Sequence, residues 1–236
     1  TNPNNNAYGT HLLGSSYFML GYQRKDIFKG FGLKAGLALI HYSNSSVKSP
    51  NSSANTFAAT LGVNYQIDAY KQASFIKTAG FEKIKQPIHL NLVLRGGIQE
   101  GRVIGLGQKP FVVVSAYADK RLSFKSSIQV GVDAIFAKFL ETEIAYSAVA
   151  FPENGVRGDE DYKRVGVFVG YELHINKLSL IGQVGYYAYY PYKFEARVYL
   201  RPGLKYYITE KIFTVVTLKS HWASAENVAF GVGFRI

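Results

Sequence analysis

The sequence predicts an all-β fold, and more narrowly an antiparallel transmembrane β-barrel, from three observations. Apolar residues alternate with small or polar ones along most of the chain, which is the period of a strand with two unlike faces. Most alternating segments exceed the roughly five or six residues of soluble strands and suit the tilted crossings of about 9–11 residues in a membrane barrel. The second face carries Gly, Ala, Ser, Asn and Gln, and charged residues make up only 18% of the chain. A soluble all-β domain, the alternative, would expose a heavily charged face.

The alternation divides the chain into about eleven strands. In one segment Phe57, Leu61 and Val63 share a face, while Thr60 and Asn64 share the other. No helical period is sustained. The expected strands, in order, lie near 10–23, 30–43, 56–68, 87–100, 110–118, 122–136, 161–174, 177–190, 195–208, 211–222 and 227–236.

The composition limits the classes of partner and of site. The chain has 236 residues, no cysteine and a net charge of +11, which would suit nucleic acid, phospholipid or lipopolysaccharide. Its basic residues are spread over loops and the inferred lumen instead of one soluble face with exposed aromatics, so we expect no nucleic-acid partner. No motif for a metal or a cofactor is present, and neither is expected. No apolar run approaches the roughly 18 residues of a membrane helix.

The lengths of the connections predict the orientation of the barrel. Short turns of bacterial barrels lie on the periplasmic side and long loops lie outside. The short connections are Asp119–Arg121, His174–Lys177 and Thr209–Lys211, and the long alternate ones are Asn44–Asn55, Gly101–Lys109 and Ala137–Glu160. The connection 69–86 is an exception, because it is long and yet falls on the periplasmic side.

This orientation places residue 236 in the periplasm and residue 1 outside the cell. Eleven strands with ends on opposite sides cannot close an even-numbered barrel. We therefore expect residues 1–236 to form a single outer-membrane barrel domain that lacks at least one N-terminal strand, with about twelve strands in all. The expected location is the bacterial outer membrane.

One polar cluster carries a pattern of catalytic chemistry. His41 and Ser43 are two residues apart on an expected strand, so both side chains project from the same face. A histidine can act as general base to a hydroxyl nucleophile, and the amide of the adjacent Asn44 can donate to a developing oxyanion. The alternative is a histidine and a serine at the membrane rim, solvated by lipid headgroups.

The same residues carry a family resemblance. His41-Tyr42-Ser43-Asn44, followed by Pro50-Asn51, resembles the signature of PagL-type lipid A 3-O-deacylases, and the chain is most similar to their longer acyloxyacyl hydrolase relatives in Bacteroidetes. The likeness extends to the segments Tyr190–Phe194, Gly203–Tyr207, Leu218–His221 and Gly231–Phe234. The resemblance implies an outer-membrane barrel that hydrolyses an acyl ester of lipid A. It also implies that Ser43 is the nucleophile, His41 the general base and Asn44 a contributor to the oxyanion hole.

One position departs from the family pattern. The deacylases place a glutamate fourteen residues after the motif histidine, whereas this chain has Asn55 there. An asparagine can accept a hydrogen bond from the imidazole but stabilises imidazolium less, and losing an orienting carboxylate can cost up to about 10⁴-fold in turnover. In a ring of twelve strands, His221 and Glu226 would lie roughly 14–19 Å from Ser43. We therefore assign these two residues to a second site at the rim and not to the catalytic group.

Basic residues in the expected outer loops suit the phosphates of lipopolysaccharide. Lys48 and Lys193 are the candidates for this contact. The leading hypothesis is an outer-membrane esterase similar to the lipid A deacylases. The alternative is a catalytically weak or inactive barrel that serves as a structural or partner-binding subunit among other outer-membrane proteins. A small pore is a third, weaker option, since about twelve strands leave little open lumen.

Overall fold

The computed structural model describes residues 7–67, 86–222 and 224–236, and these contain eleven β-strands, which confirms the all-β fold. The strands are β1 (Gly14–Phe28), β2 (Phe31–Ser43), β3 (Ala54–Tyr65), β4 (Ile88–Gln99), β5 (Lys109–Arg121), β6 (Ser126–Ala137), β7 (Arg164–Ile175), β8 (Leu178–Tyr189), β9 (Val198–Tyr207), β10 (Ile212–His221) and β11 (Ser224–Arg235). A helix, α1 (Lys138–Ala150), and a short 3₁₀ turn, Pro152–Asn154, lie between β6 and β7.

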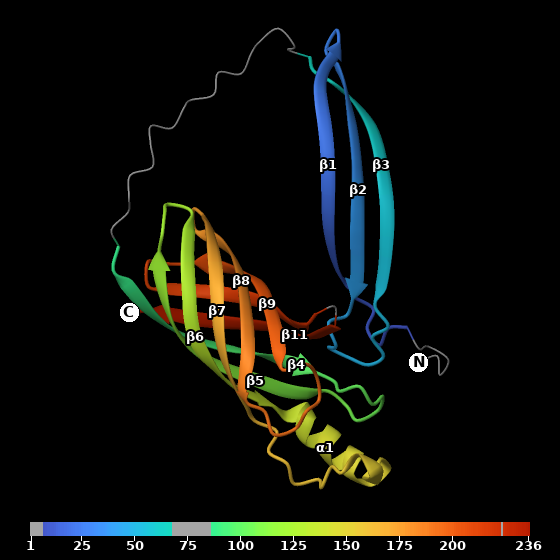
Figure 1. The fold of residues 1–236 in the computed structure, drawn as a ribbon, viewed down its shortest axis with the longest axis vertical. Coiled ribbons are helices and arrows are strands. Elements are labelled where there is room, and N and C mark those ends of the chain that lie inside the picture. The colour runs from blue at the N-terminus through green and yellow to red at the C-terminus, as the bar shows by residue number, and fades with distance from the viewer. Residues whose placement is uncertain (1–6, 68–85, 223) are drawn as a thin grey trace.

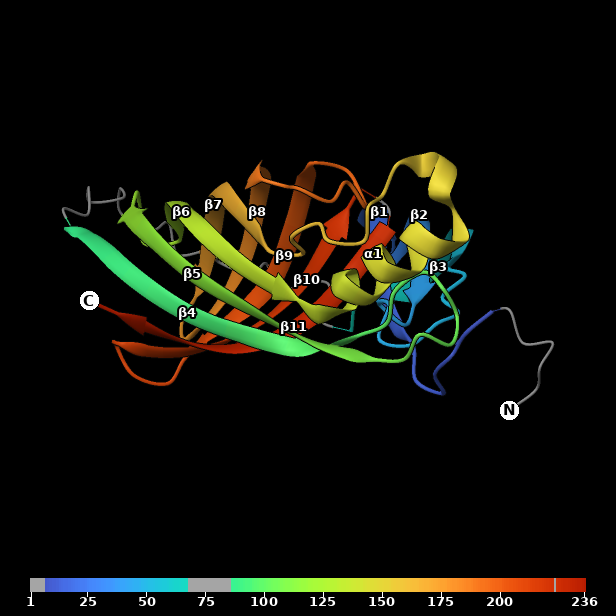
Figure 2. The same cartoon turned by 90° about the horizontal axis from the view of Figure 1, so that it is seen from below.

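Strands β4 to β11 form a closed antiparallel barrel in which each strand pairs with its neighbours in sequence (Figures 1 and 2). The ring closes where β11 meets β4, with Val232 opposite Leu94 and Phe234 opposite Leu92. Closure gives each of these eight strands two neighbours, so none of them leaves a free edge of backbone groups.

The two faces of the barrel strands confirm that the alternating apolar residues point outward and the polar ones point into the lumen. Outward-facing side chains are apolar and open to the surroundings; Leu92, Val132 and Val169 are 51%, 49% and 62% exposed. Inward-facing side chains such as Asp133 and Glu172 are completely buried although they are charged. The exposed apolar belt is the surface that lipid covers in an outer-membrane barrel.

The lumen is filled by polar side chains that pair across it. Arg201 donates to both carboxylate oxygens of Asp133 at 2.7 and 3.2 Å, and Lys205 donates to Glu172 at 3.0 Å. Tyr199 also donates to Asp133. An eight-stranded barrel has just enough interior for its side chains, so this network occupies the space that a channel would need.

Strands β1, β2 and β3 lie outside this ring, in a separate antiparallel sheet (Figure 1). Its register pairs Leu37 with Ala59 and Leu39 with Phe57, and the face that these residues share is apolar. The opposite face carries mainly small residues such as Thr60 and Gly62, with the charged Lys34 opposite Gly62. The eleven strands therefore do not share one ring, as the expectation of about twelve strands in a single barrel had assumed, because alternation reveals a strand without revealing its neighbours.

The helix α1 is an element that the alternation does not reveal. Its buried residues Phe139, Leu140, Glu143 and Ile144 recur at the spacing of one helical face. The segment has only 13 residues inside a long connection, so its period is easily lost beside the strands. No helix in the described ranges is long and apolar enough to cross a membrane.

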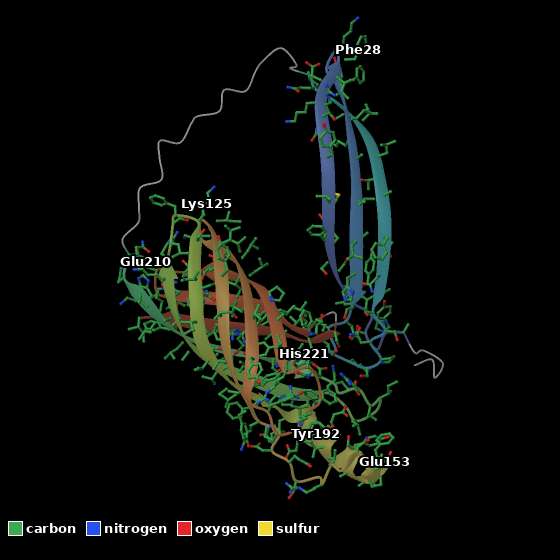
Figure 3. The ribbon with its side chains drawn as sticks, viewed as in Figure 1. Phe28, Lys125, Glu153, Tyr192, Glu210 and His221 are labelled. Carbon is green, nitrogen blue, oxygen red and sulfur yellow. The ribbon has the colours of Figure 1, made fainter. Side chains whose placement is uncertain are left out.

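Five connections gather at one end of the molecule, the end at which Figure 3 labels His221, Tyr192 and Glu153. Four of them, residues 100–108, 138–163, 190–197 and, at the turn from β10 to β11, 222 and 224–225, belong to the barrel, and we call them the barrel mouth. The fifth, the 44–53 loop, joins β2 to β3 and contacts the mouth, with Ser46 Oγ 2.9 Å from the carbonyl oxygen of Ala225. Phe28, Lys125 and Glu210 mark the opposite end (Figure 3). The connections that the sequence places outside the cell thus share one end of the fold.

Candidate active site

The pairing of β2 with β3 positions the histidine of the motif. His41 lies directly opposite Asn55 in the register, and its Nδ1 is 2.8 Å from Asn55 Oδ1. A carboxamide oxygen can only accept a hydrogen bond, so Nδ1 carries the proton in this pair. The lone pair of the neutral ring is then on Nε2, the tautomer that a general base needs.

Ser43 is the last residue of β2, and only 5% of it is exposed. Its Oγ accepts a hydrogen bond from the backbone N–H of Ser45 at 2.9 Å. The carboxamide of Asn51 lies on the other side, with Nδ2 3.0 Å from the same oxygen. Among the described residues His41 makes no hydrogen bond to Ser43, whose hydroxyl donates to Asn51 Oδ1 at 3.2 Å. Hydrogen bonds between a nucleophile and its base often tighten only when a substrate is bound.

The side chain of Asn44 shapes the 44–53 loop. Its Nδ2 donates to the carbonyl oxygens of Lys48 and Pro50 at 2.6 and 3.2 Å, and its Oδ1 accepts from the N–H of Ser46 at 3.0 Å. Both amide hydrogens are thereby used inside the loop. In this geometry the Asn44 carboxamide has no hydrogen left for an oxyanion.

Asn51, and not the expected Asn44, places its carboxamide beside the hydroxyl of Ser43. Besides its contact with Ser43, its Oδ1 accepts from the backbone N–H of Asn44 at 2.9 Å. The sequence carried a signal for Asn51, since Pro50-Asn51 belongs to the family signature. Spacing alone could not place it next to Ser43, because the two residues are eight positions apart along an irregular loop.

His41 and Ser43 open into a cavity of about 290 Å³ between the 44–53 loop and the barrel mouth. Ile104, Phe139 and Phe194 form an apolar part of its wall, and the two phenylalanine rings pack edge to face with centroids 5.5 Å apart. A hydroxyl and an imidazole beside apolar rings suit a substrate that has both an ester and a hydrocarbon chain.

The basic residues chosen from the sequence lie outside this cavity. Lys48 and Lys193 are both exposed, and neither lines the cavity wall. Arg102 lines it instead, stacked on the ring of Phe194 at 4.6 Å and 3.4 Å from Glu195. Nothing in the sequence marks Arg102 apart from other loop arginines, because its role depends on the ring beneath it.

The proposed second site at the rim is a buried cluster inside the barrel mouth. His221 Nε2 lies 2.8 Å from Glu226 Oε2 and 2.9 Å from Glu195 Oε2, while its Nδ1 faces the carbonyl oxygen of Val198 at 3.0 Å. Figure 3 shows His221 at this end of the barrel. The three ligand-type groups lie within 4.8 Å of one another, close enough to hold a metal ion.

Basic side chains already balance these carboxylates. Lys219 Nζ is 2.9 Å from Glu226, Arg164 is 3.8 Å from the same residue, and Arg102 pairs with Glu195. A divalent cation would add charge to a cluster that is already neutralised. We therefore interpret the cluster as an ion-pair network that stabilises the mouth.

The last hairpin meets the loop that follows Ser43. Glu226 lines the same cavity as Ser43, and the carbonyl oxygen of Ala225 touches Ser46. The earlier estimate of about 14–19 Å assumed that strand spacings separate the two regions. They are brought together instead by the 44–53 loop, which folds over the mouth of a separate barrel.

The comparisons with known proteins agree with this two-part structure. The sequence model of the acyloxyacyl hydrolase C-terminal domain matches residues 88–236, and that of lipid A 3-O-deacylase (PagL) matches residues 1–64. The first match spans the closed barrel, and the second contains His41, Ser43 and Asn55. No curated protein matches the chain.

Among solved structures, the similarities to this chain have low scores. A de novo designed transmembrane β-barrel has a TM-score of 0.39 at 15% identity, covering 66% of this chain and 100% of the design. The outer membrane phospholipase of Salmonella typhi scores 0.27 at 13% identity, covering 92% and 77%, and a mutant porin of Rh. blastica scores 0.22 at 10%, covering 95% and 91%. These scores are too low to bear on chemistry. The match over residues 88–236 confirms the resemblance: the chain belongs to the acyloxyacyl hydrolase family and is an outer-membrane protein of the lipid-modifying, ester-hydrolysing kind.

Proposed function

We propose that this protein hydrolyses an acyl ester of lipid A in the outer leaflet of the outer membrane. The observation that carries the proposal is the meeting of Ser43, the His41–Asn55 pair and an apolar wall at one cavity. The match of residues 1–64 to a lipid A 3-O-deacylase supports the choice of substrate.

The reaction proceeds by nucleophilic catalysis. The Oγ of Ser43 attacks the acyl carbonyl carbon while Nε2 of His41 takes the hydroxyl proton, and the C–O bond to the sugar breaks as His41 returns that proton to the leaving alkoxide. Water then attacks the acyl-serine with His41 again as base and releases a fatty acid. Asn51, rather than Asn44, donates to the carbonyl oxygen as negative charge develops there.

The acyl chain and the phosphates of the substrate contact other parts of the cavity. The acyl chain lies against Ile104, Phe139 and Phe194, and Arg102 at the rim faces a phosphate. Lys48 and Lys193 stand on exposed loops at the same end, where they attract the anionic lipopolysaccharide surface without contacting the reacting ester.

The test is release of fatty acid from lipopolysaccharide by the purified protein, followed by mass spectrometry of the remaining lipid A. We expect release by the wild type and at least a 10³-fold loss in Ser43→Ala and His41→Ala, on the order found for other serine hydrolases. Ser123→Ala, in a turn at the opposite end, is the matched control and should keep full activity. Intact lipid A after incubation with wild-type protein would refute the proposal.

A specific feature favours a second function. Asn55 replaces the carboxylate that usually orients the histidine, and a neutral partner stabilises imidazolium less. A barrel with a weak or lost activity would then serve as a structural or partner-binding subunit of an outer-membrane complex. Normal lipid A in cells that overproduce the protein, together with co-purification of another outer-membrane protein, would favour this function.

A further inference from the structure

Glu100 is a buried carboxylate at the contact between the barrel and the 44–53 loop. It follows β4 directly and is only 6% exposed. Its Oε2 accepts a hydrogen bond from the backbone N–H of Ser49 at 2.9 Å, and its Oε1 accepts from that of Gly107 at 3.1 Å. Within the described ranges it forms no ion pair with a basic side chain. Two backbone donors therefore hold a buried charge that would otherwise be unsatisfied.

These contacts join the barrel to the loop that carries the nucleophile. The backbone N–H of Glu100 also donates to the carbonyl oxygen of Ser46 at 3.0 Å. Ser49 Oγ donates to the carbonyl oxygen of Gly101 at 2.6 Å, and Gln108 Nε2 donates to that of Val47 at 2.8 Å. Glu100 thus stands at the centre of a set of hydrogen bonds that fix residues 46–49 on the barrel mouth.

The path from Glu100 to the nucleophile is short. Ser49 is followed by Pro50, whose carbonyl oxygen accepts from the side chain of Asn44, and then by Asn51, whose carboxamide touches Ser43 Oγ. A shift of Ser49 would move the Asn51 amide relative to that oxygen. A misplacement of about 1 Å in a catalytic arrangement can cost on the order of 10²-fold in rate.

We propose that Glu100 is a positioning residue for hydrolysis, through which the closed barrel holds the 44–53 loop in its active shape. This inference rests on the proposed function and assigns the C-terminal barrel a part in it. Glu100 also lines the cavity, but each of its oxygens accepts a hydrogen bond from a backbone N–H group, so we assign it to positioning Asn51 through Ser49 and not to contact with the reacting ester. The barrel would then contribute to the reaction as well as holding the protein in the membrane, although His41 and Ser43 lie on the β1–β3 sheet.

The test is a set of three variants of the full chain, purified in detergent. Glu100→Gln keeps the size of the side chain but offers one acceptor for two donors, so we expect kcat to fall by about 10- to 100-fold while KM changes less than about twofold. Glu100→Asp keeps both acceptors on a shorter side chain and should recover part of that loss. Glu141→Gln, on the exposed face of α1 and outside the cavity, is the matched control.

Hydrogen–deuterium exchange provides a measurement that needs no activity. We expect faster exchange in a peptide covering 44–53 of Glu100→Gln, with no change in the strands of the barrel. An unchanged kcat, an effect on KM alone, or unchanged exchange in the loop would overturn the proposal. If the wild type itself releases no fatty acid, the proposed function fails, whereas the exchange result still decides whether Glu100 holds the loop.

Discussion

The closed barrel and the three-stranded sheet present similar apolar faces and entirely different opposite faces. In the barrel, long charged residues inside the lumen pair between strands that are not neighbours: Arg201 of β9 with Asp133 of β6, and Lys205 of β9 with Glu172 of β7. In the sheet, the corresponding face of β2 and β3 carries small groups such as Gly36 and Thr60 that meet only their immediate neighbours. The apolar face therefore indicates contact with lipid, whereas the lumen face indicates which strands share a ring.

The two regions also differ in what their polar residues do: those of the barrel stabilise the fold, and those of the sheet belong to the proposed reaction. The residues of the proposed hydrolysis, His41 and Ser43, stand on the sheet and its loop, while the buried ion pairs lie inside the barrel. We therefore expect substitutions in the barrel lumen to change unfolding strongly. Substitutions on the sheet should change activity and leave unfolding nearly unaltered.

The largest effect is expected for Asp133→Ala. It leaves the guanidinium of Arg201 buried without its partner, which typically costs about 3–5 kcal/mol. The matched change on the sheet, Lys34→Ala, removes an exposed charge and should shift stability by less than about 0.5 kcal/mol. Urea unfolding in lipid vesicles, followed by the fluorescence of Trp222, measures both. Equal shifts for the two variants would contradict the division between barrel and sheet.

A smaller effect is expected where a glycine makes room for a ring. A Cβ on Gly185 would lie 2.0 Å from the ring of Tyr199, whereas a Cβ on Gly182 of the same strand would meet nothing within 4 Å. Gly185→Ala should therefore destabilise the barrel by about 1–3 kcal/mol through overpacking. Gly182→Ala is the control and should be close to neutral in the same unfolding experiment. A neutral Gly185→Ala would mean that Tyr199 moves freely, which its burial argues against.

The sequence predicted the strands far better than their association. The segment expected near 87–100 is β4, Ile88–Gln99, because its alternation is unbroken. By contrast, the first strand runs to Phe28, beyond the expected end at 23, because Arg24 and Lys25 suggest a turn while pairing with β2 continues. No local pattern shows that β11 pairs with β4, since that pairing joins residues more than a hundred positions apart.

In the candidate site, too, the sequence predicted contacts between adjacent strands but not contacts made by loops. The pairing of His41 with Asn55 follows from two adjacent strands and a spacing of fourteen, so the sequence could indicate it. The contacts of Asn51, Arg102 and Glu100 depend on how irregular loops dock on the barrel mouth. Loop conformation is set by such tertiary contacts and not by a repeating pattern, so these residues became visible only in the structure.

The sheet should respond to Asn55→Glu in activity and not in stability. A carboxylate 2.8 Å from His41 Nδ1 would stabilise imidazolium in the transition state, so we expect kcat to rise by about tenfold, equivalent to about 1.4 kcal/mol. The free energy of unfolding should change by less than about 0.5 kcal/mol, because residue 55 lies on the exposed sheet. Asn64→Glu, at the other end of β3, is the control for added charge. Unchanged kcat in Asn55→Glu would indicate that asparagine already orients the ring adequately.

The smallest effect is expected in the loop before β7, which tests whether the barrel's strength resides in its lumen and not in its connections. Exposed Glu160 accepts hydrogen bonds from the backbone N–H groups of Arg157 and Gly158 at 2.8 and 3.0 Å, and these donors, that of Arg157 foremost, lower the pKa of its carboxyl. Because the pKa is lowered in the folded loop, the loop contacts are fully formed at pH values above the ordinary glutamate pKa of about 4.3. They are lost only as the pH falls through the lower pKa of the folded state. NMR titration of the carboxyl should show this lowered pKa, and Glu160→Gln should loosen the loop while the urea midpoint of the barrel stays unchanged. A shift of the urea midpoint in Glu160→Gln would mean that this loop, as well as the ion pairs in the lumen, stabilises the barrel. It would contradict the assignment of the barrel's stability to its lumen.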